Sequence, residues 1–170
     1  IDDYAFYELP IDRIYLPSTL KKIGDYAFYR TGACGELILP ESVEYIGKDA
    51  FRGTLIYTLE INRMYPDMHN VLYGAFSACS ALNYIRLGKN ITYLPEKAFL
   101  KCIGIEYIYY TQNLESIGDY AFAYCTTLKS FYQYSEDGDY DNEKIIKYIG
   151  DGAFYCCYKL EYFYFYNGFE

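Results

Sequence analysis

The dipeptide Ala-Phe recurs seven times along the chain at nearly constant spacing, and this repeat constrains the fold more than any other feature. The phenylalanines stand at positions 6, 28, 51, 76, 99, 122 and 154. The intervals are 22, 23, 25, 23, 23 and 32 residues, so five of the six lie within two residues of 23. Repetition at a fixed period of this length is typical of a solenoid in which each repeat forms one turn.

Other positions follow the same period. Five residues before each Phe stands an aliphatic residue: Ile1, Ile23, Ile46, Val71, Leu94, Ile117 and Ile149. Nine residues before it, five turns carry a short polar side chain that can bond turn backbone: Thr19, Ser42, Asp67, Asn90 and Asn113. A glycine follows the aliphatic residue at positions 24, 47, 118 and 150, where we expect a tight turn that needs a positive φ.

Each Phe is followed by a short segment of alternating character, which predicts a strand with one buried face. The predicted inward pairs are Ile14/Leu16, Leu37/Leu39, Leu59/Ile61, Ile85/Leu87, Ile108/Tyr110, Phe131/Gln133 and Phe163/Phe165. Pro17 and Pro40 end the first two strands, as expected of a residue without a ladder donor. The small Ala leaves room for the neighbouring Phe ring, so the Ala-Phe row is predicted to form core on the side away from the strands.

A single turn of about 23 residues cannot bury its apolar side chains, whereas stacked turns can, because each covers the next. We therefore predict one domain over residues 1–170: a leucine-rich-repeat solenoid of seven turns. Its parallel sheet is expected on the concave face and short turns or 3₁₀ segments on the convex face. The chain begins inside a repeat, so we expect it to be a fragment of a longer protein.

Segments such as "IGDYAFAYCTTLKSF", "IGDYAFYRTG" and "LILPESVEYIGKDAF" resemble the BspA-like, or Treponema-type, leucine-rich repeats. The resemblance extends over nearly the whole chain and departs in turn four, "INRMYPDMHNVLYGAF", and in turn seven. It implies a surface or secreted protein that takes part in adhesion, host-protein binding or aggregation between cells. The family has no general catalytic residues, so the resemblance implies that the chain is not an enzyme.

Residues between and beside the inward pairs are predicted to face outward, and in turns four to seven tyrosine dominates them. These outward tyrosines are Tyr84, Tyr107, Tyr109, Tyr132, Tyr134, Tyr162, Tyr164 and Tyr166. Tyrosine offers a rigid ring and a hydroxyl at low entropic cost, so we predict that they and Arg86 bind a protein, for instance a host extracellular protein, or a glycan. The alternative is a spacer or stalk in which the rings only stabilise the strands.

Composition argues against several other functions. The net charge is 15 − 23 = −8, without a basic run, which disfavours nucleic-acid binding. No apolar run approaches the roughly 20 residues that span a bilayer. His69 is the only histidine and no Cys-x-x-Cys motif occurs, so we expect neither zinc nor another cofactor. His69 has no catalytic partner in a motif and is predicted to be a surface side chain.

The cysteines and one insertion are the remaining features that could carry a metal, a disulfide or a reactive group. Cys79, Cys102, Cys125 and Cys157 follow a Phe by three residues, and Cys34 aligns with Leu82 in a core slot, so we predict buried free thiols. The insertion at 135–143, "SEDGDYDNE", has alternate carboxylates that could bind calcium but lacks the other residues of an EF-hand loop. A solvated acidic loop is the alternative. Uncapped end turns would also permit end-to-end self-association.

Overall fold

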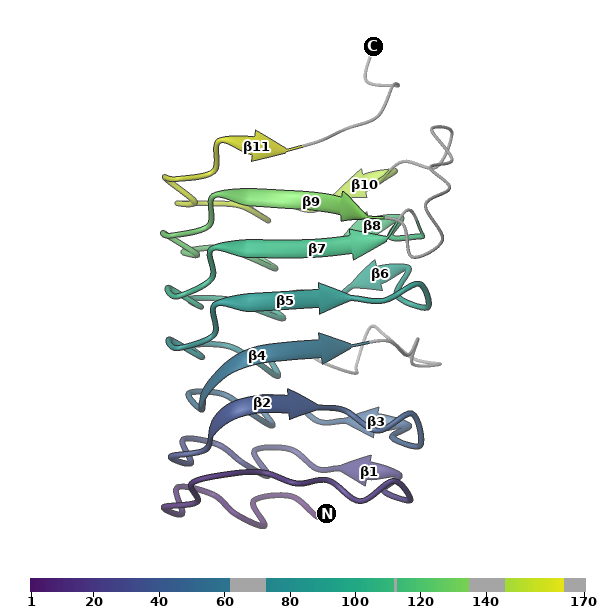
Figure 1. Cartoon of the computed structure of the whole chain (residues 1–170), viewed down its shortest axis with the longest axis vertical. Coiled ribbons are helices and arrows are strands. Elements are labelled where there is room, and N and C mark those ends of the chain that lie inside the picture. Colours follow the sequence, from purple (N-terminus) through teal and green to yellow (C-terminus); the bar gives the residue numbers. More distant parts are fainter. Residues whose placement is uncertain (62–72, 112, 135–145, 164–170) are drawn as a thin grey trace.

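The chain winds into a stack of turns with a broad parallel sheet along one side, as the computed structural model shows (Figure 1). The structure describes residues 1–61, 73–111, 113–134 and 146–163. None of these residues is helical. The predicted solenoid class is therefore confirmed.

The main sheet contains six parallel strands, in which neighbouring strands come from successive turns. They are β2 (Cys34–Ile38), β4 (Leu55–Ile61), β5 (Tyr84–Leu87), β7 (Tyr107–Thr111), β9 (Ser130–Tyr134) and β11 (Tyr162–Phe163). The register places equivalent inward residues side by side, as in the pairs Ile85↔Ile108 and Ile108↔Phe131. Burial alternates along β5 and at the start of β7, which confirms the predicted period of two.

Five two-residue strands form smaller sheets around the aliphatic position that precedes each Phe by five residues. β1 (Lys22–Ile23) pairs with β3 (Tyr45–Ile46), and β8 (Ser116–Ile117) lies between β6 (Tyr93–Leu94) and β10 (Tyr148–Ile149). The short polar residues nine positions before the Phe connect neighbouring turns as well. Ser42 donates to the carbonyl of Leu20, and Asn113 donates to that of Lys89, both at 2.7 Å.

The side that carries the Ala-Phe dipeptides, here called the turn side, is a chain of tight turns. In the second repeat, alternate amides close turns within the repeat, from Ala27, Tyr29 and Thr31 to the carbonyls of Gly24, Tyr26 and Phe28. The amides in between reach the next repeat, from Tyr26, Phe28 and Arg30 to the carbonyls of Lys48, Ala50 and Arg52 at 2.7–2.9 Å. Every amide in this stretch therefore has a partner, which explains how a non-helical backbone can be stacked so closely.

This alternation requires left-handed backbone two residues before and two residues after each Phe. All seven repeats show it, with φ between 50° and 72°. The residues are Tyr4, Glu8, Tyr26, Arg30, Asp49, Gly53, Gly74, Ala78, Lys97, Lys101, Tyr120, Tyr124, Gly152 and Cys156. Because left-handed geometry costs a non-glycine residue about 1–2 kcal/mol, the stacking bonds must offset this strain at most of these positions.

The hydrogen bonds between repeats have a direction that differs between two sides of the stack. On the turn side, amides donate to the following repeat, as Phe28 does to Ala50 at 2.7 Å. Beside β1 and β3, amides donate to the preceding repeat, as Gly47 does to the carbonyl of Ile23 at 2.9 Å. Each repeat is thus bonded to its neighbour through donors on one side and acceptors on the other.

The glycines after the aliphatic position have a different role from the one predicted. Positive φ is absent from Gly24, Gly47, Gly118 and Gly150, so that expectation is wrong. A Cβ at Gly118 would lie 2.7 Å from the backbone nitrogen of Glu96, and one at Gly47 would lie 2.5 Å from that of Asp25. These positions need glycine because the preceding repeat's backbone occupies the space of a side chain.

The core between the two sides is organised by a ladder of phenylalanine rings. Consecutive rings of the Ala-Phe dipeptides lie 5.0–5.7 Å apart between centroids and within 17° of parallel. The alanines of these dipeptides are fully buried from Ala27 to Ala121, and Ala153 is nearly so, whereas Ala5 is exposed. The predicted Ala-Phe core is therefore confirmed from the second repeat onward, and the ring ladder continues through all seven repeats.

The first two repeats depart from the predicted pattern. Ile14 and Leu16 lie in a segment that forms no strand, so β2 is the edge of the main sheet. A register shift between Gly35 and Glu36 interrupts the pairing of β2 with β4. Ala33 is buried in place of Cys34, which is exposed, so the predicted core position of Cys34 is wrong.

Candidate functional site

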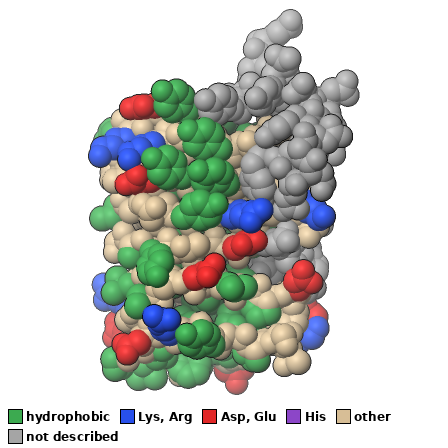
Figure 2. Space-filling view, viewed as in Figure 1, with side chains coloured by type: hydrophobic (Ala, Val, Ile, Leu, Met, Phe, Trp, Pro, Cys, Tyr) green, Lys and Arg blue, Asp and Glu red, His purple; other side chains and the backbone are tan. Residues whose placement is uncertain are grey.

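The outer surface of the main sheet carries a cluster of tyrosines over β5, β7, β9 and β11. Figure 2 looks onto this surface, where hydrophobic side chains, tyrosines included, gather in the upper half. We call Tyr84, Tyr107, Tyr109, Tyr132 and Tyr162 the tyrosine face. The first four are half-buried, and Tyr162 is 51% exposed. Tyr134 ends β9 but its side chain lies outside the description, as do Tyr164 and Tyr166.

Three of these rings support one another across successive strands. The rings of Tyr84 and Tyr109 lie 5.1 Å apart between centroids, and those of Tyr109 and Tyr132 lie 5.6 Å apart, with interplanar angles of 30° and 25°. Burial, aided by the neighbouring phenols, raises the pKa of Tyr109. Its hydroxyl therefore remains protonated at neutral pH and can both donate and accept a hydrogen bond.

Two cations border the tyrosine face. Arg86 stands beside Tyr109 in the register of β5 and β7, and its guanidinium lies 4.0 Å from a carboxylate oxygen of Glu60. The Lys129 ammonium lies 2.6 Å from a carboxylate oxygen of Glu106 and 5.6 Å from the centroid of the Tyr107 ring. These ion pairs are partly exposed, so they can exchange their carboxylates for those of a partner at small energetic cost.

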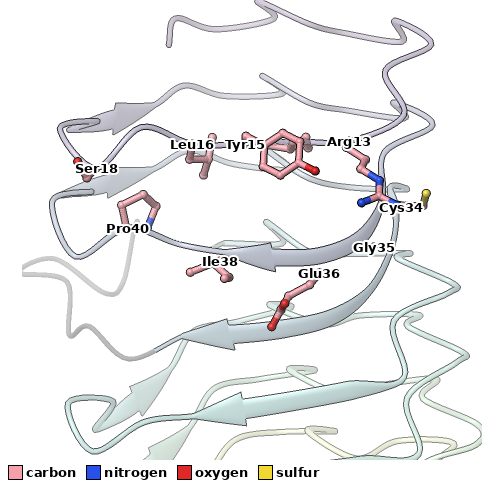
Figure 3. A pocket seen from close by; sticks show the side chains of 10 residues that line it. Arg13, Tyr15, Leu16, Ser18, Cys34, Gly35, Glu36, Ile38 and Pro40 are labelled. Atoms are coloured by element: carbon pink, nitrogen blue, oxygen red, sulfur yellow. The ribbon is translucent and has the colours of Figure 1, made fainter.

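A pocket that the sequence did not predict lies at the opposite end of the same surface, between the first two repeats. Its volume is about 510 Å³, and its walls include Arg13, Tyr15 and Leu16 from the first repeat and Glu36 and Ile38 from β2 (Figure 3). Two sequence signals lay nearby, because Pro17 and Pro40 follow these segments and Gly35 stands where the register shifts.

The cysteine row belongs to the core. The thiols of Cys79, Cys102, Cys125 and Cys157 each donate to the carbonyl of the Phe in the preceding repeat, at 2.9–3.3 Å. Burial raises the pKa of Cys102 and Cys125 well above the usual range and that of Cys157 to about 11. All six cysteines are free, as predicted, and Cys79, Cys102 and Cys125 are buried, whereas Cys157 is only partly so. The raised pKa values of Cys102, Cys125 and Cys157 disfavour thiolate chemistry at these three thiols, whereas at Cys79 burial is outweighed by hydrogen bonds with Cys102 and Thr54, which lower the pKa.

The described residues give no support to a metal site or a membrane-spanning helix. Within the described ranges, no group of three His, Cys, Asp or Glu residues is placed to hold a metal ion. The acidic insertion at 135–143 and His69 both lie outside those ranges. A search of the described part of the chain for a helix with the length and apolarity to cross a membrane finds none.

Comparisons with known proteins place this fold in a family. The model of the BspA type leucine rich repeat region matches residues 1–129 and 67–170, with six copies. A leucine-rich repeat protein from Bacteroides ovatus has a similar structure, with a TM-score of 0.65 and 22% identity over 94% of this chain and 44% of that one. The T. pallidum leucine rich repeat protein TpLRR gives a TM-score of 0.69 and 21% identity over 94% of this chain and 70% of that one.

These likenesses to solved structures concern the fold, and the present chain spans less than half of the B. ovatus protein. No curated protein matches the sequence. The family model, however, covers the whole chain and coincides with the repeat seen in both sequence and structure. The chain belongs to the BspA-type leucine-rich repeat family.

Proposed function

We propose that this chain is a non-catalytic protein-binding module of a cell-surface or secreted adhesin-like protein, with the tyrosine face as its contact surface. The observation that carries the proposal is the gathering of Tyr84, Tyr107, Tyr109, Tyr132 and Tyr162 on one side of the main sheet. Binding surfaces favour tyrosine because a ring with two rotatable bonds loses little entropy when it is held. Family membership supports the location, since such repeats occur in surface or secreted proteins.

The packing of the rings favours a protein partner over a glycan. A sugar stacks on the open face of an aromatic ring. The faces of Tyr109 are occupied in part by Tyr84 and Tyr132, at 5.1 and 5.6 Å. Ring edges and hydroxyls remain, together with Arg86 and the Lys129–Glu106 pair at the border. Edges, hydroxyls and partly exposed charges are the groups that protein interfaces combine.

A structural spacer is the second candidate, and the same ring contacts support it. Rings that pack on each other stabilise neighbouring strands whether or not they meet a ligand. In that case the module holds other domains apart, and the tyrosine face has no partner of its own.

The two candidates are separated by a binding screen against extracellular matrix proteins and a glycan panel. The test variant is Tyr107/Tyr109/Tyr132→Ser. Its matched control is Tyr120/Tyr124/Tyr155→Ser, which removes three tyrosines from the turn side, where they are 41–55% exposed. We expect a protein ligand that the control retains and the test variant loses, while circular dichroism shows that both variants remain folded.

A third variant, Tyr109/Tyr132→Phe, keeps the ring packing and removes only the hydroxyls. Loss of binding in this variant would assign the recognition to hydrogen bonds. If the test variant binds as well as the wild type, or if no ligand is found, the tyrosines are scaffold and the spacer function stands.

A further inference from the structure

The pocket between the first two repeats opens where the main sheet stops. Segment 13–16 runs beside β2 but forms no strand. Among the described residues, the backbone bond from the Cys34 amide to the Asp12 carbonyl, at 2.9 Å, joins the two repeats at the start of this stretch. No backbone hydrogen bond continues the ladder from segment 13–16 to residues 36–38 in this part of the structure. β2 therefore has an open edge along the pocket.

The lining shows that the pocket enters between two backbones. Ile14 and Leu16 alternate with Arg13 and Tyr15 along one segment, yet all four line it. Because side chains in an extended segment alternate between faces, a pocket confined to one face would meet only every second residue. Its volume of about 510 Å³ falls within the range of roughly 300–1,000 Å³ typical of ligand sites.

The two ends of the pocket differ in chemistry. Figure 3 shows the Arg13 side chain extending from the first repeat toward Cys34 at one end, while Leu16, Ser18 and Pro40 lie toward the other end. Ile38, 64% exposed, and Tyr15, 82% exposed, present apolar surface to solvent. The pocket thus combines a cationic end with an apolar end, and the Glu36 side chain lies between them (Figure 3).

Arg13 differs from the other arginines that the structure describes. The guanidiniums of Arg30, Arg52 and Arg86 lie 3.6, 3.4 and 4.0 Å from carboxylate oxygens. Arg13 has no such carboxylate among the described residues. Its guanidinium interacts instead with the neutral Tyr15 phenol, which raises the pKa of Arg13. A phenol occupies only part of the five N–H donors, so the guanidinium can still hold a carboxylate from outside with two parallel hydrogen bonds.

From these observations we propose that the pocket binds an extended peptide segment that adds as a strand to the open edge of β2. The backbone of the peptide bonds the free groups of β2, its apolar side chains contact Leu16, Ile38 and Pro40, and one acidic side chain binds Arg13. Strand addition of this kind derives affinity from main-chain bonds and specificity from side-chain pockets. The site is separate from the tyrosine face and does not depend on the function proposed for it.

The test begins with a phage-displayed library of random heptapeptides, selected on the whole protein. Clones that also bind the Arg13→Gln/Ile38→Lys variant are discarded. Both substitutions alter exposed side chains, so the fold is retained. We expect the remaining clones to share an acidic residue next to alternating apolar residues. The best peptide is then synthesised in three forms: unmodified, with its acid replaced by the amide, and with alternate backbone nitrogens methylated.

Strand addition predicts that methylation of the peptide abolishes binding and that Arg13→Gln weakens the unmodified peptide about tenfold. The amide form should bind the wild type about tenfold more weakly than the unmodified peptide does. Its affinity should not change further when the protein carries Arg13→Gln. Amide NMR shifts should move at 13–16 and 35–38. The matched controls Arg86→Gln and Tyr107/Tyr109/Tyr132→Ser should bind the peptide as the wild type does.

Three results would overturn the proposal. One is the absence of any clone whose binding depends on the pocket residues. Another is equal binding of the methylated peptide, which would assign the affinity to side chains alone. A third is a set of NMR shifts on β7 and β9, which would place the peptide on the tyrosine face.

Discussion

The turn side and the sheet side arise from the same repeat, yet they respond differently to variation in its sequence. On the turn side all seven copies keep the same pair of left-handed residues and the same stacked Phe ring. On the sheet side the strands vary from seven residues in β4 to four in β5, and the first repeat forms none. The stacking of repeats therefore depends on the turn side, which leaves the sheet surface free to diversify.

The two sides differ in their tolerance of sequence change because the number of constraints on each residue differs. A turn-side residue has its backbone amide hydrogen-bonded within its repeat or to the next repeat, and it lies next to a residue whose backbone must be left-handed. It also packs beside the ladder of Phe rings. An outward strand residue is held by ladder bonds that any residue except proline can form, and outward tyrosines such as Tyr109 and Tyr132 are only half-buried. Functional surfaces can therefore change on the sheet without loss of the stack. Four substitutions test this difference, from the largest expected effect to the smallest.

Phe76→Ala should destabilise the protein by about 3–5 kcal/mol, since it empties a fully buried position in the ring ladder. Tyr132→Ala on the sheet side removes a half-buried ring of similar size and should cost less than half as much. Urea unfolding followed by circular dichroism gives both values. Equal losses would show that the two sides are under the same constraint.

Gly118→Ala should destabilise by about 1–3 kcal/mol. The added methyl would lie 2.7 Å from the Glu96 backbone nitrogen, which cannot move without the whole repeat. Gly32→Ala is the matched control, because its methyl would meet only the Ile11 carbonyl oxygen at 3.5 Å, an ordinary contact. The same unfolding assay should find the control nearly neutral, and a cost for Gly32→Ala equal to that of Gly118→Ala would refute the packing explanation.

Ala78→Gly should stabilise the protein by up to about 1 kcal/mol, since φ is 55° at this position and glycine removes the strain. Ala98→Gly changes the same atoms at a fully buried alanine without positive φ and should destabilise it instead. The sign of the shift in thermal midpoint distinguishes the two variants. A loss of stability in both would mean that the left-handed residues are not strained.

Lys129→Met should produce the smallest effect, since the ion pair with Glu106 is partly exposed. The hydrogen bond to Glu106 raises the pKa of Lys129. Because the folded-state pKa is raised, the contribution is fully present below the unfolded pKa and is lost as pH rises through the folded value. The free energy of unfolding should therefore fall between pH 7 and a pH above 11, and it should fall more in the wild type than in the variant. An equal fall in both proteins would show that the Lys129–Glu106 ion pair does not contribute to stability.

The repeat period predicts the turn side well at the level of side chains but poorly at the level of backbone. Phe and Ala recur at nearly constant intervals, and from Ala27 to Phe122 their burial follows that spacing. The left-handed positions hold Tyr, Glu, Arg, Asp, Ala, Lys, Cys and Gly, so no residue preference reveals them. The role of Gly118 could not be predicted for a related reason, because the clash that requires glycine comes from the backbone of another repeat.

The strands of the sheet side could be predicted from the alternation that follows each Phe, except in the first repeat. The inward residue of the strand follows Phe76, Phe99 and Phe122 by nine residues, and the structure confirms these strands. The distance is eight residues after Phe6 and Phe51. After Phe51 the predicted inward residues Leu59 and Ile61 are buried in β4, although the register with β2 shifts, whereas after Phe6 no strand forms. The pocket lies beside this unformed strand. It could not be predicted, because the bulge and the missing strand depend on how the repeats fit together in three dimensions and not on the residue pattern. Whether the outward tyrosines bind a partner stays a prediction.

The opposed directions of the bonds between repeats bear on how the protein assembles as it is synthesised. A folded stack ends in free amides on the turn side and free carbonyls beside the short strands, as the Phe28 and Ile23 partners illustrate. An arriving repeat that is reversed would meet amide with amide and carbonyl with carbonyl. The completed part of the molecule thus acts as a polar template that accepts the next 23 residues in one orientation and rejects the other.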